Sequence, residues 1–379
     1  MNILHSTETE WLALICALVI QLCLILYTLS AGADFGGGIL SLFKPKDKVL
    51  QKLWRQTIDE AIAPIWESNH VWLIVAIVVL FVCFPVGFSW ISIGLHGPLL
   101  FLLLGISLRG AAFVFAHYDP QGISKTWYQV FMISSTFTPI SLGIIAGAIA
   151  SGQLAEVMHN LMIGEKANQL NYMAVDGSLW WSTWWAPFPI MVGLMTVALF
   201  AWLSAIYLNV ELVNKTISAQ QHNSTEDAET LNNLLALQKV TRIRASFAQL
   251  ALALSAGMAL FVLDDSLAIE RLLWGSYAPW LHLTVGLSAI LALWTLWYNQ
   301  AHLARFFGVM QAIGIVSGWT VSSLPYLLPT HLPLAEAAAS PKTLWATLLC
   351  VVIALTLVLP SLWYLIKIFK QPQLEKTSV

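Results

Sequence analysis

The chain has 379 residues, of which 58% are apolar and only 10% are charged, and its formal net charge at pH 7 is −2. This composition excludes a water-soluble domain, because too few polar side chains remain to cover a surface that faces water. It indicates an integral membrane protein without a separate soluble catalytic domain.

Apolar runs of membrane-crossing length follow one another along the chain. A helix needs about 20 consecutive apolar residues to cross the hydrocarbon core of a bilayer. We predict an all-α integral membrane protein whose nine transmembrane helices form two helical bundles, at roughly 11–32, 60–85, 88–116, 127–150, 184–212, 244–264, 277–298, 303–326 and 343–367. A β-barrel is excluded because its strands would alternate apolar and polar residues.

Basic residues predict the orientation, because short cytoplasmic loops collect lysine and arginine. Fourteen of the 18 fall on one side of the predicted helices: Lys44, Lys46, Lys48, Lys52, Arg55, Lys125, Lys215, Lys239, Arg242, Arg244, Arg305, Lys367, Lys370 and Lys376. Only Lys166, Arg271 and Lys342 fall on the other side, and Arg109 lies inside a helix. The N-terminus is therefore predicted to be periplasmic and the C-terminus cytoplasmic. The first helix, with no basic residue before it, is predicted to be retained rather than cleaved as a signal peptide.

A polar stretch suggests a division of the chain into two halves. Residues 214–243 include a segment with the composition of a linker. We predict an N-terminal helical half at 1–213, which holds the first five crossings and the polar motifs. The cytoplasmic linker at 214–243 joins it to a C-terminal half at 244–379, which holds the last four crossings.

The four cysteines, Cys16, Cys23, Cys83 and Cys350, all fall in apolar segments. None belongs to a Cys-x-x-Cys pair, so their spacing predicts neither a disulfide framework nor a zinc or iron–sulfur site. We interpret these cysteines as small apolar side chains that pack in the core or face lipid. We predict no metal ligand in the chain.

Few polar groups interrupt the predicted helices, and an ionised side chain near the bilayer centre costs at least about 2.5–3.5 kcal/mol. The polar side chains within the predicted helices are Asp34, Glu67, Asn69, His70, His96, Arg109, His282, Asp264 and Asp265. Glu67 lies roughly 10 Å in from the cytoplasmic end of the second helix, and His70 shares its face three residues on. This pair could pass protons along a file of water. It could equally satisfy its own hydrogen bonds or seal a contact with another subunit.

The sequence SAGADFGGG at 30–38 lies at the inner end of the first helix. Four glycines in seven residues allow close helix contact or local unwinding, and close packing is the favoured interpretation. Asp34 could join a proton path at this place. We interpret Arg109 as the counter-ion of Asp34, of Glu67 or of an acid on a partner.

Histidine and methionine side chains raise the question of a haem bound by this chain, since His70, His96 and His282 are conceivable axial ligands. No Cys-x-x-Cys-His motif occurs, and no two of these histidines stand in an evident paired arrangement. The sequence therefore favours a chain that binds no cofactor by itself.

Two motifs together carry a resemblance to a known family. ADFGGG at 33–38 is followed by a basic loop, then by APIWESNHVWL at 63–73, and then by Arg109 with Phe113 four residues on. This series resembles subunit II of the cytochrome bd-type quinol oxidases, and nine helices with an outside N-terminus agree with it. The motifs cover about the first third of the chain, and the rest agrees in topology.

The resemblance implies a respiratory terminal oxidase, a multi-pass complex of the bacterial cytoplasmic (inner) membrane in which quinol is oxidised and O2 is reduced to water. The haems, b and d or b alone, are expected on the partner, subunit I, and no catalytic residue is expected in subunit II. Trp66 and Glu67 match the Trp-acid pair of the family's proton route from the cytoplasm. Asp34 and Arg109 match polar positions on the first and third helices.

These matches complete the predicted site. The expected proton path comprises Glu67, His70 and Asp34, with Trp66, Asn69 and Arg109 in supporting roles. The resemblance also implies a pseudo-symmetric heterodimer with subunit I in contact with membrane lipid, with quinol and O2 as substrates of the complex and no nucleic acid. The resemblance also implies a structural quinone site, and it does not decide whether the complex has a small accessory membrane subunit.

The sequence departs from the best-known branch of that family at three positions. Ala31 replaces an acid, Glu67 replaces Asp in the Trp-acid pair, and His70 replaces an amide or an acid. These differences resemble the cyanide-insensitive or another divergent branch, and they leave the haem types open.

Two other interpretations compete with this one. A proton-coupled secondary transporter would use residues 32–38 as a broken helix beside its substrate site, with Glu67 coupling protons to transport. The second half of the chain shows no matching interrupted segment. A purely structural scaffold for subunit I is the other alternative, and it predicts that Glu67→Gln leaves turnover intact.

Overall fold

The computed structural model of the chain describes residues 2–62, 69–117, 125–162, 181–221, 225–262 and 266–370. The helices are α1 (Asn2–Ser41), α2 (Lys48–Ile62), α3 (Asn69–Cys83), α4 (Pro85–Gly94), α5 (His96–His117), α6 (Lys125–Ala150), α7 (Gln153–Met162), α9 (Pro187–Gln221), α10 (Thr225–Phe261), α11 (Leu267–Trp274), α12 (Ala278–Trp297), α13 (Ala301–Ser323), α14 (Leu334–Ala337) and α15 (Pro341–Lys370). Two short antiparallel strands, β1 (Tyr326–Leu328) and β2 (Leu332–Pro333), lie between α13 and α14. The predicted helical fold class is confirmed.

Eight of the described helices are each long and apolar enough to cross a membrane. The crossing predicted at 60–85 is different, because its described apolar part is the 15-residue α3. α3 reaches crossing length only together with α4, and the two helices are bent by 117°. The break falls at Phe84, whose backbone is not helical (φ −133°, ψ 61°), and at Pro85, which has no N–H for the helical ladder.

The bend also corrects the next predicted crossing. α4 continues to Gly94, and α5 begins at His96, so the predicted start at residue 88 is wrong. Leu95 separates the two helices with a non-helical backbone (φ −116°, ψ 24°). Most side chains around this boundary are apolar, so hydropathy alone does not reveal it.

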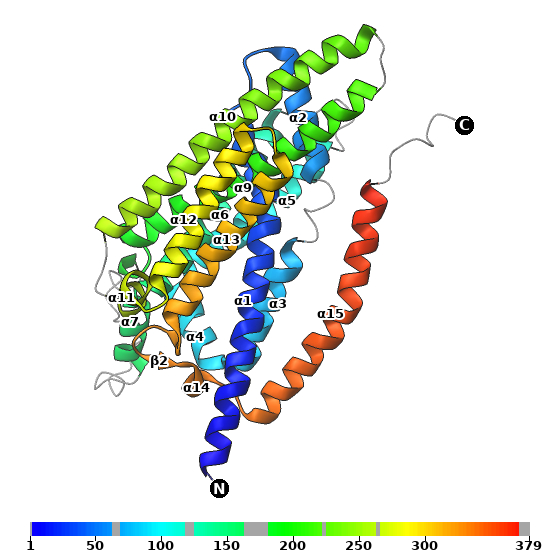
Figure 1. Ribbon diagram of the computed structural model, residues 1–379. Coiled ribbons are helices and arrows are strands. Elements are labelled where there is room, and N and C mark those ends of the chain that lie inside the picture. Colours follow the sequence, from blue (N-terminus) through cyan, green and yellow to red (C-terminus); the bar gives the residue numbers. More distant parts are fainter. Residues whose placement is uncertain are drawn as a thin grey trace.

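α1 lies at the centre of the fold (Figure 1). It packs against α3, α6, α9 and α13. α9 and α10 form one long helical pair, and α12 and α13 form another beside it. α15 stands apart on the far side of α1, where α1 and α3 are its principal neighbours, and only 6% of its crossing segment is buried.

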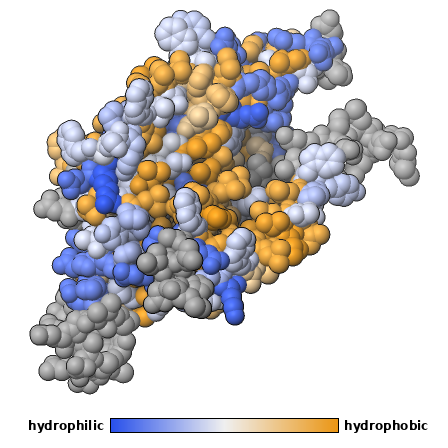
Figure 2. Space-filling view, turned by 60° about the horizontal axis from the view of Figure 1, so that its bottom comes forward, coloured by the Kyte–Doolittle hydropathy of each residue, from blue (hydrophilic) through white to orange (hydrophobic). Residues whose placement is uncertain are grey.

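Apolar side chains cover much of the outside of the molecule. Figure 2 shows them as a broad region across the middle of one face, with hydrophilic residues gathered towards its ends. Phe261, the last residue of α10, exposes 92% of its surface, and Trp274, the last residue of α11, exposes 84%. Such an outside suits hydrocarbon, and exposed tryptophans are typical of the membrane interface.

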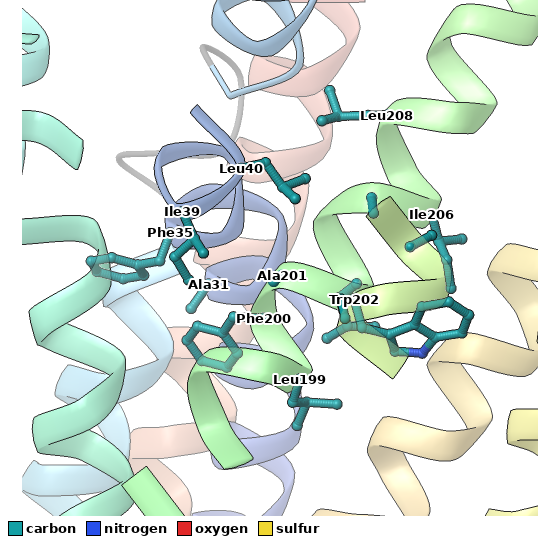
Figure 3. Close-up of a cluster of buried hydrophobic side chains, with 14 of the residues drawn as sticks. Ala31, Phe35, Ile39, Leu40, Leu199, Phe200, Ala201, Trp202, Ile206 and Leu208 are labelled. Carbon is teal, nitrogen blue, oxygen red and sulfur yellow. The ribbon is translucent and has the colours of Figure 1, made fainter. Parts of the chain in front are cut away.

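Small residues allow α1 and α9 to approach closely. A Cβ added at Gly36 would lie 2.1 Å from the backbone oxygen of Phe200, and one at Gly32 would lie 2.6 Å from the side chain of Leu203. Figure 3 shows the buried side chains along this contact, including Ala31, Phe35, Ile39, Leu199, Ala201 and Trp202. α1 continues as a helix to Ser41, so the glycines serve close packing and not local unwinding.

The segment 214–243, predicted as a linker, is helical wherever the structure describes it. It contains the end of α9 and the start of α10. Gln238 donates from Nε2 to Thr216 Oγ1 at 2.6 Å and to the Leu212 carbonyl oxygen at 3.2 Å, so the two helices remain joined there. The described residues of 214–243 therefore belong to two long helices, while the division into two halves joined by a linker stays a prediction.

A buried hydrogen bond joins α9 to α13, because Trp202 donates from Nε1 to Gln311 Oε1 at 2.9 Å. We expect Gln311→Leu to lower the free energy of unfolding by about 1 kcal/mol, since the buried indole N–H loses its acceptor. Thermal unfolding of the purified protein in detergent measures this effect. Adding Trp202→Phe should recover part of the loss, and a second loss of equal size would contradict the explanation.

Candidate functional site

Three helices meet at a buried ion pair. Asp34 of α1 and Arg109 of α5 form a salt bridge, and neither side chain has any exposed surface. Asn69, the first described residue of α3, donates from Nδ2 to Asp34 Oδ2 at 2.5 Å. Among the counter-ions considered for Arg109, Asp34 is thus the one that the structure places beside it.

Aromatic rings enclose the guanidinium of Arg109. Its Cζ lies 5.4 Å from the ring centroid of Phe35, 5.6 Å from that of Phe113 and 5.4 Å from that of Phe131. These distances suit cation–π attraction, which is stronger where water is excluded. Because a charge in such surroundings has lost its hydration, the Asp34 carboxylate is what makes burial of Arg109 tolerable.

His70 lies beside this ion pair on α3, one position after Asn69. Its ring is 6.3 Å from the ring of Tyr27 and 6.1 Å from that of Phe35, both on α1. Its Nδ1 is buried and has no hydrogen-bond partner among the described residues. An imidazole with an unpaired ring nitrogen is able to accept or donate a proton.

Other buried polar atoms near the ion pair share this property. Tyr27 Oη, Asn69 Oδ1, and Nε and Nη1 of Arg109 also have no hydrogen-bond partner in the described part of the chain. Buried polar groups are rarely left without one, and ordered water is the usual partner at such places. The cluster is therefore a group of buried polar atoms with unused hydrogen-bonding capacity inside an apolar bundle.

The remaining predicted site residues are either outside the described residues or exposed. Trp66, Glu67, Asp264 and Asp265 lie outside the described residues. His96 and His282 are exposed side chains on α5 and α12. Within the described ranges, no group of three or more His, Cys, Asp or Glu side chains is placed to hold a metal ion.

Sequence reasoning missed two buried polar residues. Tyr27 lies seven residues before Asp34, so two helical turns place it on the same face of α1, and this interval could have revealed it. Asn209 of α9 has no exposed surface, and neither polar atom of its amide has a partner among the described residues. As an isolated amide in a long apolar run, Asn209 gives no sequence signal of that kind.

Comparison with known proteins places these features in a family. The family model described as cytochrome bd terminal oxidase subunit II matches residues 12–369. The chain belongs to this family. The resemblance drawn from the motifs at 33–38 and 63–73 is thereby confirmed, and the transporter interpretation is left without support.

Individual relatives of this subunit II chain are distant. A stretch of 131 residues is 28% identical to cytochrome bd ubiquinol oxidase subunit 2 of Bacillus subtilis and covers 34% of this chain and 38% of that protein. A stretch of 209 residues is 23% identical to cytochrome bd-I ubiquinol oxidase subunit 2 of Escherichia coli K12 and covers 55% of this chain and 51% of that protein. These matches therefore span about half or less of the length of the curated relatives.

A solved structure extends the similarity to the whole fold. A chain in the structure of bd oxidase from Geobacillus thermodenitrificans superposes with a TM-score of 0.64 over 95% of this chain and 98% of that chain. At 19% sequence identity, this match shows the fold alone.

Proposed function

We propose that this chain is the haem-free subunit of a respiratory quinol:O2 oxidoreductase, that it packs against a haem-bearing subunit I, and that it supplies a proton path from the cytoplasm. The observation that carries the proposal is the cluster of Asp34, Arg109, Asn69 and His70. An unpaired imidazole nitrogen beside a buried ion pair is costly in a membrane and is typical of proton relays there.

We infer no haem site at His70, His96 or His282, the three histidines considered as axial ligands. The ring contacts described for His70 are with Tyr27 and Phe35 of α1, so aromatic side chains already crowd this imidazole. His96 and His282 are exposed on separate helices. We therefore assign the haems, b and d or b alone, to subunit I, where they would carry out O2 reduction.

The side chains of this chain would handle protons. Arg109 holds Asp34 as a carboxylate, and Asn69 fixes the orientation of that carboxylate by donating to Oδ2. His70 follows Asn69 on α3, and its buried, unpaired Nδ1 is the atom that would carry the proton. Glu67, three residues earlier, would accept the proton from the cytoplasm and pass it through water to His70.

The same proposal includes orientation and surroundings. The bias of the basic residues supports a periplasmic N-terminus and a cytoplasmic C-terminus. The proposed membrane is the bacterial inner membrane, in keeping with a respiratory oxidase. Quinol and O2 are the substrates of the proposed complex. A structural quinone and a small accessory membrane subunit are compatible with it, and no residue of this chain is assigned to either.

Purification from the native membrane tests the proposed complex. The chain is isolated in mild detergent without added cofactors, co-purifying polypeptides are identified by mass, and a reduced-minus-oxidised visible spectrum is recorded. Haem bands together with a second large membrane subunit are expected. A haem-free chain, isolated under conditions that retain known membrane complexes, would refute the oxidase assignment.

We expect Glu67→Gln to reduce quinol oxidase turnover at least about tenfold in an assembled complex, because the amide cannot relay a proton. Oxygen consumption with excess quinol measures turnover, and the haem spectrum confirms assembly. Glu60→Gln is the control: Glu60 is 61% exposed and pairs at 2.6 Å with Lys215, so its loss should leave turnover unchanged. Normal turnover of Glu67→Gln would favour the structural scaffold instead.

A further inference from the structure

A guanidinium group is stacked on an indole ring where α2 meets α10. α2 packs against α1, α9 and α10 at one end of the bundle (Figure 1). Cζ of Arg244, on α10, lies 4.4 Å from the centroid of the Trp54 ring, on α2. Trp54 is almost fully buried and belongs to the largest apolar cluster. Arg244 is therefore held over a ring that the core itself fixes in place.

Both members of this pair have hydrogen-bond donors that no described residue uses. Trp54 Nε1 and Arg244 Nη1 are buried and have no hydrogen-bond partner in the described part of the chain. No salt bridge joins Arg244 to a described acid. A guanidinium has five N–H donors and no acceptor, so it needs oxygen acceptors around it. The other described arginines that are not exposed each reach such an oxygen, namely Arg55 at Asp59, Arg109 at Asp34, Arg242 at Gln238 and Arg271 at the Leu324 carbonyl.

Arg244 marks the point at which α10 changes from polar to apolar. Lys239 and Arg242 precede it, and no charged residue follows it before the helix ends at Phe261. This last part of α10 rises about 25 Å, at 1.5 Å per residue, which is close to the hydrocarbon thickness of about 30 Å. Arg244 therefore lies near one boundary of the hydrocarbon, at the level of lipid headgroups. Tryptophan and arginine are both well suited to that level.

A row of exposed apolar side chains continues from Arg244 along one face of α10. Phe247, Leu254 and Met258 each expose more than half of their surface. They follow Arg244 at successive intervals of three, seven and four residues, and residues at such intervals share a helix face. A cationic group at the head of an apolar row matches a phospholipid, which has a phosphate at one end and acyl chains below it. A soluble phosphate ion would use the charge and leave the row without a contact.

We propose that Arg244 and Trp54 bind the phosphate of an anionic phospholipid, whose acyl chain lies along Phe247, Leu254 and Met258. The guanidinium would form charge-assisted hydrogen bonds with one phosphate oxygen, and the indole N–H would donate to another. The excess of basic residues in the sequence at this end of the helices favours a lipid with a net negative charge over a zwitterionic one. The inference rests on this stacked pair and is independent of the proposed proton path.

A lipid at this place would attach α2 to the bundle. The direct polar contacts of α2 with α9 come from Lys215, which donates from Nζ to Glu60 at 2.6 Å and to Thr57 at 3.5 Å. Trp54 lies one helical turn before Thr57, so a phosphate shared by Trp54 and Arg244 would add a second attachment, to α10. Anionic lipid is therefore expected to raise the melting temperature of the protein.

The test uses the full-length protein with its co-purifying polypeptides, delipidated in mild detergent and incubated with mixed micelles of phosphatidylglycerol and phosphatidylcholine. Native mass spectrometry counts the lipids retained by each chain, and thermal unfolding is followed in parallel. We expect the wild-type protein to retain phosphatidylglycerol in preference to phosphatidylcholine and to melt a few degrees higher with it. Neither measurement depends on haem or on turnover, so the result is separate from that of the proposed function.

Variants locate the retained lipid. Arg244→Gln should lower the retention of phosphatidylglycerol about fivefold, the effect of one arginine near a membrane surface, and should abolish the gain in melting temperature. Trp54→Phe keeps a ring beneath the guanidinium but removes the N–H, so a smaller loss is expected. Arg305→Gln, at an exposed position of α13, is the control and should change neither quantity.

Three results would overturn the proposal. One is equal retention of phosphatidylglycerol and phosphatidylcholine by the wild-type protein, which can be measured even where a variant does not accumulate. Another is undiminished retention by Arg244→Gln. Inorganic phosphate supplies the third: if it displaces phosphatidylglycerol and stabilises the protein to the same extent, the site belongs to a soluble anion and not to a lipid.

Discussion

Arg109→Met is expected to lower the free energy of unfolding by about 3–5 kcal/mol and to prevent accumulation of the assembled protein. The substitution removes the only charged partner of Asp34 among the described residues and leaves that carboxylate fully buried. A buried charge without its partner costs far more than the pair itself contributes. Yield after membrane extraction and melting temperature in detergent measure the loss.

A double variant separates the ion pair from its surroundings. Asp34→Asn combined with Arg109→Met removes both charges, and Asn69 retains an amide oxygen at residue 34 to which it donates. We expect this variant to recover most of the lost stability, because burial of the uncharged asparagine and methionine side chains has no charge-desolvation cost. Arg305→Met, at an exposed position of α13, is the control and should be nearly neutral. Equal instability of the single and double variants would contradict this account.

Gly36→Ala is the second change with a large expected effect, a loss of about 2–3 kcal/mol in the free energy of unfolding. The new Cβ would lie 2.1 Å from the backbone oxygen of Phe200 and 2.5 Å from Cβ of Ser204, so α1 and α9 must separate. Backbone cannot rotate out of the way as a flexible side chain can. The separation would also displace Asp34, two residues earlier, from Arg109 and Asn69.

Gly110→Ala provides a matched control within the same bundle. No atom lies within 4 Å of a Cβ added at Gly110, and the residue is inside α5. Alanine stabilises a helix interior relative to glycine, so stability should stay the same or rise by up to about 1 kcal/mol. Melting temperatures of the two variants in one detergent give the comparison. A Gly36→Ala protein as stable as Gly110→Ala would refute the close contact of α1 and α9.

The sequence predicted the helices of this fold well because crossing length and apolar composition are local properties. It did not predict the bend between α3 and α4, since Phe84 and Pro85 interrupt the backbone without interrupting the apolar run. The distance over which α9 and α10 extend through 214–243 is not a local property of the sequence either. Polar composition there resembles a linker, while buried contacts such as that of Gln238 with Thr216 depend on packing between α9 and α10.

The candidate site was predictable in its residues but not in its geometry. Asp34, Asn69, His70 and Arg109 attracted notice because polar side chains are rare in apolar helices. Their pairing depends on how α1, α3 and α5 approach in space, and three counter-ions for Arg109 were open from sequence. The spacing of Tyr27 and Asp34 places both on one face of α1, but the contact of Tyr27 with His70 depends on how α1 is rotated relative to α3. The proton-handling roles of these residues stay predictions.

The lengths of α9 and α10 bear on how the complex can be imaged. They contain 35 and 37 residues, so at 1.5 Å per residue each extends more than about 50 Å. The hydrocarbon core of a bilayer is only about 30 Å thick. The length of α9 and α10 that exceeds this thickness projects into water on one side of the membrane as a narrow helical ridge. In electron micrographs of single particles in lipid nanodiscs, this ridge would serve as a built-in marker that distinguishes the two faces of the disc.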